Sequence, residues 1–166
     1  HQLASKNNIE VFCPNTFDRN TIKTVKNLNP DLIIVMAYGK ILPKEILDLP
    51  VFGCINIHVS LLPRWRGAAP IEYSLINGDK ETGISIIQLT DKLDAGPIIT
   101  QKKVVIEENC NKKELSEKLT KVGKKLLIET IPLIFNKKIT YSVQDENYAT
   151  YTRKISSEDR KINFNK

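Results

Sequence analysis

Three residues near the middle of the chain, Asn56, His58 and Asp94, are of the types that acyl transfer to an amine requires. Asn56 and His58 lie two positions apart in an apolar segment that predicts a strand, so their side chains are expected on the same face. Asp94 lies in the polar stretch 90–96, which predicts a loop able to return to them. The amide would steady an oxyanion, the imidazole would handle the ammonium proton, and the carboxylate would orient and charge the imidazole. We therefore take the three as candidate catalytic residues.

Each of these residues also has a plainer interpretation. A single histidine in a strand is more often structural than catalytic, Asn56 could be a capping or turn residue, and Asp94 could be one loop carboxylate among several. Likewise, Trp65 could be a packed surface aromatic with Arg64 and Arg66 as its solvated flanks. The trio alone is a weak indication of function.

The elements that must position the trio follow from hydrophobic patterning. The first 80 residues alternate apolar runs with helical patterns, which predicts an α/β domain with a parallel sheet. Strands are expected at 9–12, 31–37 and 53–59, and helices at 18–28, 43–49 and 70–76. Two β-rich stretches follow at 83–89 and 98–106, then an amphipathic helix at 112–128 that Pro132 should end or kink.

The site is expected at one edge of this sheet, because ligands of parallel α/β sheets bind beyond the carboxyl ends of the strands. Two apolar runs end there in unusual sequence, at 37–39 and 56–60.

The composition excludes several classes of protein. An apolar fraction of 41% and a charged fraction of 27% are ordinary for a soluble globular domain, and no apolar run is long enough to span a bilayer. The cysteines, three in number, form no CxxC pair, which disfavours a zinc or disulfide framework and fits a reduced cytoplasmic setting. Cys54 is expected to be a buried apolar residue rather than a nucleophile. The net charge of +6 is compatible with a polyanionic partner or with a lysine-rich solvated surface.

The sequence around the trio resembles folate-dependent formyltransferases. The resemblance is carried by NIHVSLLPRWRGAAPI at 56–71, DKLDAGPI at 91–98 and AYGKILP at 37–43, and it extends from about Gln2 to Asn163. The segment 64–71 is similar to the branch that acts on methionyl-tRNA. Glycinamide ribonucleotide and sugar formyltransferases share the Asn-x-His and Ser-Leu-Leu-Pro parts and diverge after them. One departure is Val59, which stands where the family usually has a smaller residue.

The resemblance implies a Rossmann-like formyltransferase fold with a mostly parallel sheet, incomplete at the N-terminus. It makes Asn56, His58 and Asp94 the catalytic residues. The implied co-substrate is 10-formyltetrahydrofolate, with no metal, and the implied acceptor is the α-amine of methionine on initiator tRNA. The residues implied in tetrahydrofolate binding are Ser60, Leu61, Leu62 and Pro63, with Lys40, Ile41, Leu42 and the loop 89–94 around the pterin. The alternatives are a formyltransferase for a small amine such as a sugar nucleotide, or a catalytically silent fragment of the family.

The resemblance also implies a domain organisation. We expect a partial catalytic domain at 1–150 and a linker at 151–166. Relatives carry a strand-helix-strand unit before the position of His1 and a tRNA-binding barrel after that of Lys166, so we expect the chain to be part of a longer, monomeric, cytoplasmic protein with no membrane association.

Overall fold

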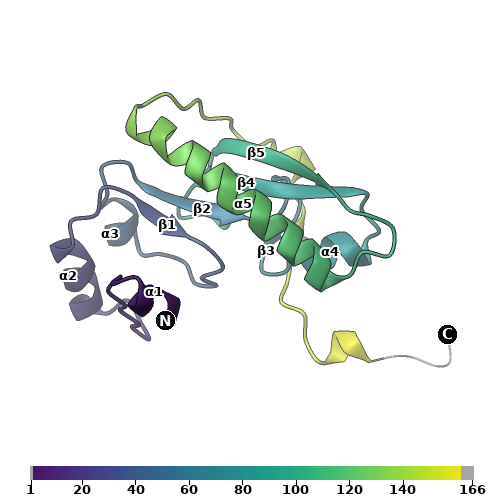
Figure 1. The fold of residues 1–166 in the computed structure, drawn as a ribbon, viewed down its shortest axis with the longest axis horizontal. Helices are drawn as coiled ribbons and strands as arrows, with labels where there is room; N and C mark the ends of the chain where they lie inside the picture. The colour runs from purple at the N-terminus through teal and green to yellow at the C-terminus, as the bar shows by residue number, and fades with distance from the viewer. Residues whose placement is uncertain (1, 162–166) are drawn as a thin grey trace.

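The computed structural model describes residues 2–161 and is built on a four-stranded sheet in the order β1-β2-β4-β5 (Figure 1). The strands are β1 (Ile33–Val35), β2 (Cys54–His58), β4 (Glu81–Gln88) and β5 (Ile98–Val105). The α/β class and the Rossmann-like arrangement predicted from the sequence are confirmed.

The sheet is parallel on one side of β2 and antiparallel on the other. Strands β1 and β2 pair in parallel, as expected for strands joined through a helix, here α3 (Lys44–Leu47). Strands β4 and β5 are joined by a loop alone, and they run antiparallel to each other, as β4 does to β2. The sheet is therefore more evenly mixed than the expected, mostly parallel one.

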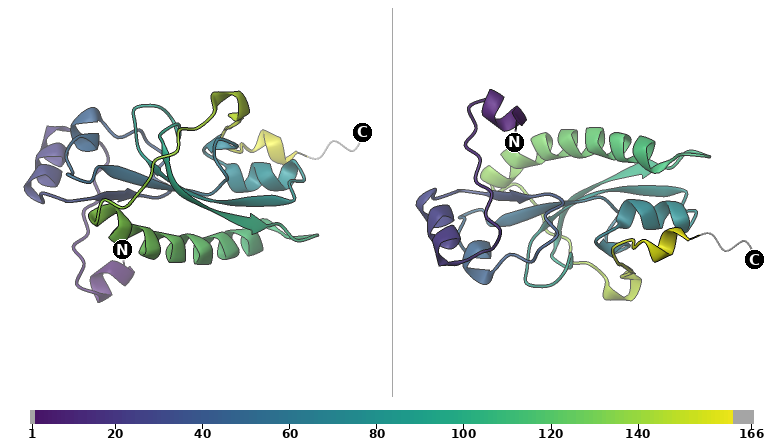
Figure 2. Two further views of the ribbon diagram at one scale, coloured as in Figure 1. Left: turned by 90° about the horizontal axis from the view of Figure 1, so that it is seen from above. Right: turned by 90° about the horizontal axis from the view of Figure 1, so that it is seen from below.

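Successive side chains of β2 face opposite sides of the sheet, so its core residues and its candidate catalytic residues lie on different faces. Ile55 and Ile57 join the main hydrophobic core, and a methyl carbon of Ile57 approaches Gly123 of α5 (Lys112–Phe135). Helix α5 covers this face of the sheet (Figure 2). Asn56 and His58 consequently point to the opposite face, because successive strand residues alternate.

Pro132 does not end α5, which continues to Phe135. The final turn is held by tertiary packing, since Ile134 is buried in the core and the Phe135 ring lies 4.7 Å from that of Phe52. These contacts offset the loss of one backbone donor at the proline. Of the two predicted effects of Pro132, an end or a kink, the end is therefore wrong, and the helix is longer than predicted.

The predicted strand at 9–12 is absent, and these residues follow α1 (Gln2–Lys6) as an irregular segment. Ile9, Val11 and Phe12 are exposed and pair with none of the described strands. An isolated apolar run has no partner for its backbone groups, so its residue types alone do not make it a strand.

The remaining helices lie close to their predicted positions. Helix α2 (Arg19–Asn27) is capped by Asp18, whose side chain accepts a hydrogen bond from the backbone N–H of Thr21. Helix α4 (Pro70–Ile76) begins at its proline and is followed by Asn77 as its C-cap residue.

The C-terminal segment packs back onto the rest of the fold and forms part of a separate, two-stranded sheet. After η1 (Glu146–Tyr148), the strand β6 (Tyr151–Thr152) pairs in parallel with β3 (Arg66–Gly67), and η2 (Glu158–Arg160) follows. The start of the expected 151–166 linker is thus part of the folded unit, and residues 162–166 lie outside the described chain. Within residues 2–161, no helix is long and apolar enough to cross a membrane.

Candidate active site

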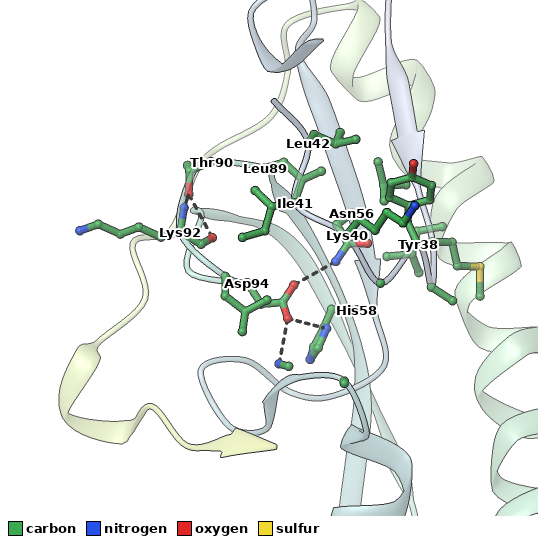
Figure 3. A pocket seen from close by; sticks show the side chains of 18 of the residues that line it. Tyr38, Lys40, Ile41, Leu42, Asn56, His58, Leu89, Thr90, Lys92 and Asp94 are labelled. Atoms are coloured by element: carbon green, nitrogen blue, oxygen red, sulfur yellow. Dashed lines mark hydrogen bonds and ion pairs between the residues drawn. The ribbon is translucent and has the colours of Figure 1, made fainter. Parts of the chain in front are cut away.

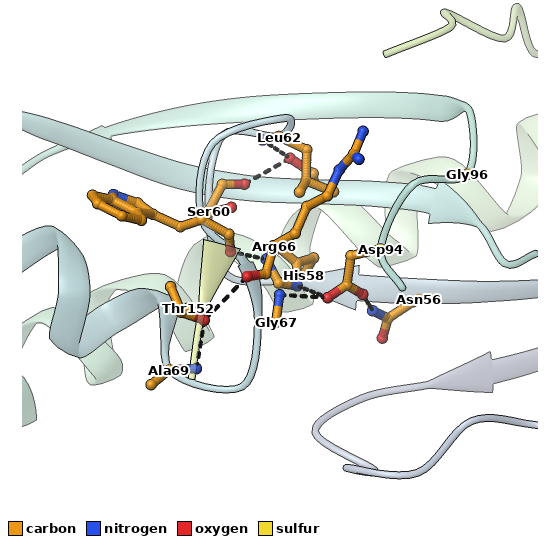
Figure 4. Close-up of polar contacts among 12 residues, drawn as sticks. Asn56, His58, Ser60, Leu62, Arg66, Gly67, Ala69, Asp94, Gly96 and Thr152 are labelled. Atoms are coloured by element: carbon orange, nitrogen blue, oxygen red, sulfur yellow. Dashed lines mark hydrogen bonds and ion pairs between the residues drawn. The ribbon is translucent and has the colours of Figure 1, made fainter. Parts of the chain in front are cut away.

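Asn56, His58 and Asp94 converge at the carboxyl end of β2 (Figures 3 and 4). The Asn56 amide donates a hydrogen bond from Nδ2 to Asp94 Oδ1 at 3.2 Å. The other carboxylate oxygen, Oδ2, lies 3.6 Å from His58 Nδ1. His58 is 5% exposed and Asp94 is 8% exposed, so their interaction is little screened by water. The convergence predicted from strand alternation and a returning loop is confirmed.

The loop after β4 delivers Asp94 in an unusual backbone conformation. Its φ is +47°, in the left-handed region that aspartate tolerates better than most residues. The carboxylate is then held from a third direction, since the backbone N–H of Gly67 donates to Oδ2 at 2.9 Å. The aspartate therefore reaches the two β2 residues and also the turn that follows them.

Both ring nitrogens of His58 face oxygen atoms that accept hydrogen bonds. Nε2 lies 2.8 Å from the carbonyl oxygen of Trp65, while Nδ1 faces the Asp94 carboxylate. A neutral imidazole carries only one N–H and leaves one of these acceptors against a bare nitrogen. A ring that carries both protons would present an N–H to each of these oxygen atoms.

A cavity of about 440 Å³ opens beside the trio (Figure 3). It is lined by Asn56, His58, the segment 35–42 and the loop 89–94, together with a few residues near Gly67. Lys40, Ile41, Leu42 and the 89–94 loop were predicted around the pterin, and the structure places them on the wall. A mostly apolar cavity with a few convergent polar groups is the usual form of a small-molecule site.

The segment Ser60–Pro63 was predicted in the folate site, but it does not belong to the cavity lining. The Ser60 hydroxyl donates to the carbonyl of Arg64, and the Ser60 carbonyl accepts from Ser85. Leu62 is buried against Ile87 and Ile98. These residues build the turn that carries Trp65 and Gly67 to the trio.

Arg66 is buried rather than a solvated flank, with a side chain only 1% exposed. Its guanidinium donates to Gln144, Glu146 and Tyr151. Residue types and spacing give no indication of Gln144, since it lies in a polar stretch with no recognisable pattern. Thr152, on β6, also lines the cavity and was missed because its segment was taken for a linker.

Cys54 is buried beneath the site and is 1% exposed. Burial, reinforced by the negative charge of Asp48, raises the pKa of its thiol to about 11. The thiol therefore stays protonated near neutral pH, and its Sγ donates to the carbonyl of Ile46 at 3.4 Å. This is the environment of a structural cysteine, in agreement with the prediction.

No group of three His, Cys, Asp or Glu side chains within residues 2–161 is placed to hold a metal ion.

Comparison with known proteins gives one consistent family. The family model described as formyl transferase matches residues 2–131. The chain is 46% identical over 166 residues to a methionyl-tRNA formyltransferase of Ehrlichia ruminantium, covering 99% of this chain and 54% of that protein. It is 51% identical over 148 residues to the methionyl-tRNA formyltransferase of Thermodesulfovibrio yellowstonii, covering 89% and 48%. The chain thus spans about half the length of the curated relatives it matches.

Solved structures agree on the fold. The formyltransferase PseJ from Anoxybacillus kamchatkensis, in complex with UDP-4,6-dideoxy-4-formamido-L-AltNAc and tetrahydrofolate, is 31% identical with a TM-score of 0.73, covering 90% of this chain and 77% of that one. Glycinamide ribonucleotide transformylase 1 from Symbiobacterium toebii has a TM-score of 0.75 at 20% identity, covering 87% and 74%, and is similar in fold.

Proposed function

The chain belongs to the formyl transferase family, and on that premise we propose that it transfers a formyl group from 10-formyltetrahydrofolate to the α-amine of methionine on initiator tRNA. The observation that carries the proposal is the convergence of Asn56, His58 and Asp94 beside one cavity. An amide donor, an imidazole ring and a buried carboxylate are the groups that acyl transfer to an amine needs.

The proposed chemistry begins with attack of the neutral amine on the formyl carbon. A carbon–nitrogen bond forms, and the carbonyl oxygen becomes an oxyanion. Asn56 donates one amide hydrogen to Asp94 and keeps the other for this oxygen, while the positive charge of His58 stabilises it. The bond from the formyl carbon to N10 of the folate then breaks. The proton lost by the amine passes to N10 with the help of Asp94.

The donor would occupy the cavity. Ile41 and Leu42 supply apolar wall for the pterin, and the backbone of the 89–94 loop supplies donors and acceptors. Lys40 is held by a 2.6 Å hydrogen bond from Nζ to the carbonyl of Asn15, which ties the wall to the preceding segment. Ser60–Pro63 contribute by shaping the turn behind the ring. The tetrahydrofolate bound to PseJ supports this use of the cavity.

The choice of acceptor rests on the relatives. The curated relatives at 46% and 51% identity are named for methionyl-tRNA, whereas PseJ, at 31%, was solved with a sugar nucleotide. The net charge of +6 suits a polyanionic acceptor. Aminoacylated initiator tRNA is present where translation occurs, so we propose that the protein acts in the cytoplasm. The second candidate, a formyltransferase for an amino sugar nucleotide, is favoured by PseJ.

A competition between acceptors tests the proposal. The protein expressed from its complete reading frame is supplied with 10-formyltetrahydrofolate and either methionyl initiator tRNA or a UDP-linked amino sugar. The proposal predicts formylmethionyl-tRNA as the product and negligible formylation of the sugar. Preferential formylation of the sugar would transfer the assignment to the second candidate.

A further inference from the structure

We propose that Gln144 is a positioning residue for Asp94, and that it forms with Thr150 and Thr152 a strap that holds both sides of the catalytic carboxylate. The proposal rests on the proposed function for its catalytic consequence. Its structural part, the placement of Asp94, stands on contacts that connect two segments 50 residues apart in sequence.

The Gln144 side chain holds the loop that carries Asp94. Its Nε2 donates to the backbone carbonyl of Asp94 at 2.8 Å and to that of Gly96 at 2.7 Å. The side chain is buried, so the amide cannot exchange these bonds for water without opening the structure. The two carbonyls lie on either side of Ala95, so one amide nitrogen sets the path of the backbone at Asp94.

The orientation of this amide is chemically determined. Arg66 donates from Nε at 3.1 Å and from a terminal nitrogen at 2.9 Å to Gln144 Oε1. A guanidinium can only donate and a backbone carbonyl can only accept, so turning the amide over would place donor against donor and acceptor against acceptor. Arg66 therefore determines that Nε2 of Gln144, and not Oε1, faces the loop. This is a structural role for the buried guanidinium.

The loop needs such a clamp because its backbone is strained and crowded. Asp94 has a positive φ, and a Cβ at Gly96 would lie 1.8 Å from the carbonyl oxygen of Gln88. A residue in the left-handed region is held there by its surroundings. Gln144 supplies two buried hydrogen bonds at this place.

The rest of the strap holds the opposite side of the carboxylate. Thr150 accepts from the backbone N–H of Trp65 through its hydroxyl and from that of Arg66 through its carbonyl. Thr152 donates from its hydroxyl to the carbonyl of Arg66 (Figure 4). These contacts fix the turn that offers the Trp65 carbonyl to His58 and the Gly67 N–H to Asp94. One segment thus positions the acceptor and the donor that flank the His58–Asp94 pair.

The test uses Gln144→Met, which removes the amide at nearly constant volume and adds no charge. We expect kcat for formyl transfer to fall about 10- to 100-fold, because displacements near 1 Å at a reacting group cost about that much. The KM for the folate should change less than about threefold, since Gln144 does not line the cavity. Gln144→Glu should behave in the same way, because it keeps an acceptor for Arg66 but places an acceptor against the two loop carbonyls.

The matched control is Glu146→Gln, which alters another partner of the same guanidinium and touches neither loop carbonyl. It should leave kcat within about twofold of the unaltered protein, because the Glu146 side chain is itself 67% exposed and glutamine keeps an acceptor for Arg66. A comparable loss in this control would assign the effect to Arg66 rather than to the clamp, and would overturn the proposal.

A second readout does not depend on formyl transfer. Because the Gly67 N–H donates to Asp94 Oδ2, its hydrogen exchange measured by NMR reports where the carboxylate lies. Gln144→Met should accelerate this exchange, and Glu146→Gln should not. Unchanged Gly67 exchange together with unchanged kcat would overturn the proposal. Faster exchange in a protein that formylates no acceptor would uphold the positioning role and refute the proposed function instead.

Discussion

Replacing Asp94 by asparagine is the substitution whose effect the geometry defines most closely. The Asp94 carboxylate accepts two hydrogen bonds, from Asn56 Nδ2 at 3.2 Å and from the Gly67 N–H at 2.9 Å. His58 Nδ1 lies 3.6 Å from the same carboxylate, within the distance of an ion pair. An asparagine side chain has one accepting oxygen, and its NH₂ must face at least one of the donors. Whichever way the amide turns, one contact becomes repulsive, and the charge that pairs with His58 is lost.

The size of the effect follows from these contacts. A hydrogen bond to a charged group contributes about 1.5–3 kcal/mol, and the pair is almost fully buried, so solvent replaces little of it. Since about 1.4 kcal/mol corresponds to a tenfold change in rate, Asp94→Asn should lower the turnover rate by roughly 10- to 150-fold. The folate should still bind, because Asp94 is one of many residues around the cavity.

The assay is single-turnover formyl transfer to methionyl initiator tRNA, with folate affinity measured in parallel. Asp31→Asn, an exposed position just before β1, is the matched control and should keep its full rate. A rate for Asp94→Asn within threefold of the unaltered protein, with folding intact, would refute the role that we assign to the carboxylate.

Three further predictions concern the scaffold. Gly96→Ala should lower both the melting temperature and the rate, because its Cβ would collide with the Gln88 carbonyl at 1.8 Å; a thermal melt and a rate assay check this. Burial raises the pKa of Cys54 from 9.0 to about 11, so the thiol contributes stability below pH 9 that is lost as the pH rises through 11. The free energy of unfolding, measured with urea, should decrease between pH 9 and pH 11. The decrease should be on the order of 2 kcal/mol larger in the unaltered protein than in Cys54→Ala. Burial alone would raise the pKa of Asp79. Hydrogen bonds from Arg64 and neighbouring groups outweigh this effect, so the pKa lies below its usual value. Asp79→Asn should therefore cost about 1–3 kcal/mol at neutral pH, and the difference in urea unfolding should shrink as acid protonates the aspartate.

The sequence predicted those parts of the fold that depend on local patterning. Strand β2 and helix α4 were placed almost to the residue, because a buried apolar run and a proline at the first helical position are strong local indications. The segment 9–12 has the same residue types as a strand but no partner, and only pairing decides whether such a run becomes one. The helix continues past Pro132 because Ile134 and Phe135 pack against the rest of the protein, which the local sequence does not indicate.

The candidate site was predictable where it rests on alternation and less so where it rests on distant contacts. Asn56 and His58 share a face because they are two residues apart in a strand, and this required no knowledge of the fold. That Asp94 meets them depends on a loop closing, which the spacing suggested and the hydrogen bonds confirm. Gln144 carries no signal in its own neighbourhood, because its importance comes from Arg66 and from carbonyls some 50 residues away.

The misjudged segment was the C-terminal one. Its polar composition suggested a linker, yet Thr150 and Thr152 use their hydroxyl groups to bind the backbone of the turn after β2. Polar residues that satisfy buried backbone groups are indistinguishable in a sequence from polar residues that face water. Arg66 was misjudged for the same reason. Its charge predicted exposure, but hydrogen bonds to Gln144 and Glu146 allow it to be buried.

The decisive measurement compares His58→Ala with the unaltered protein, with tetrahydrofolate binding and formyl transfer to methionyl initiator tRNA measured on the same preparation. If His58 acts in the chemical step, binding should change only a few-fold while the transfer rate falls by about 10³, the scale of a lost acid–base and charge-stabilising group. A His58→Ala protein that binds folate and transfers the formyl group at an unchanged rate would contradict the assignment of this site.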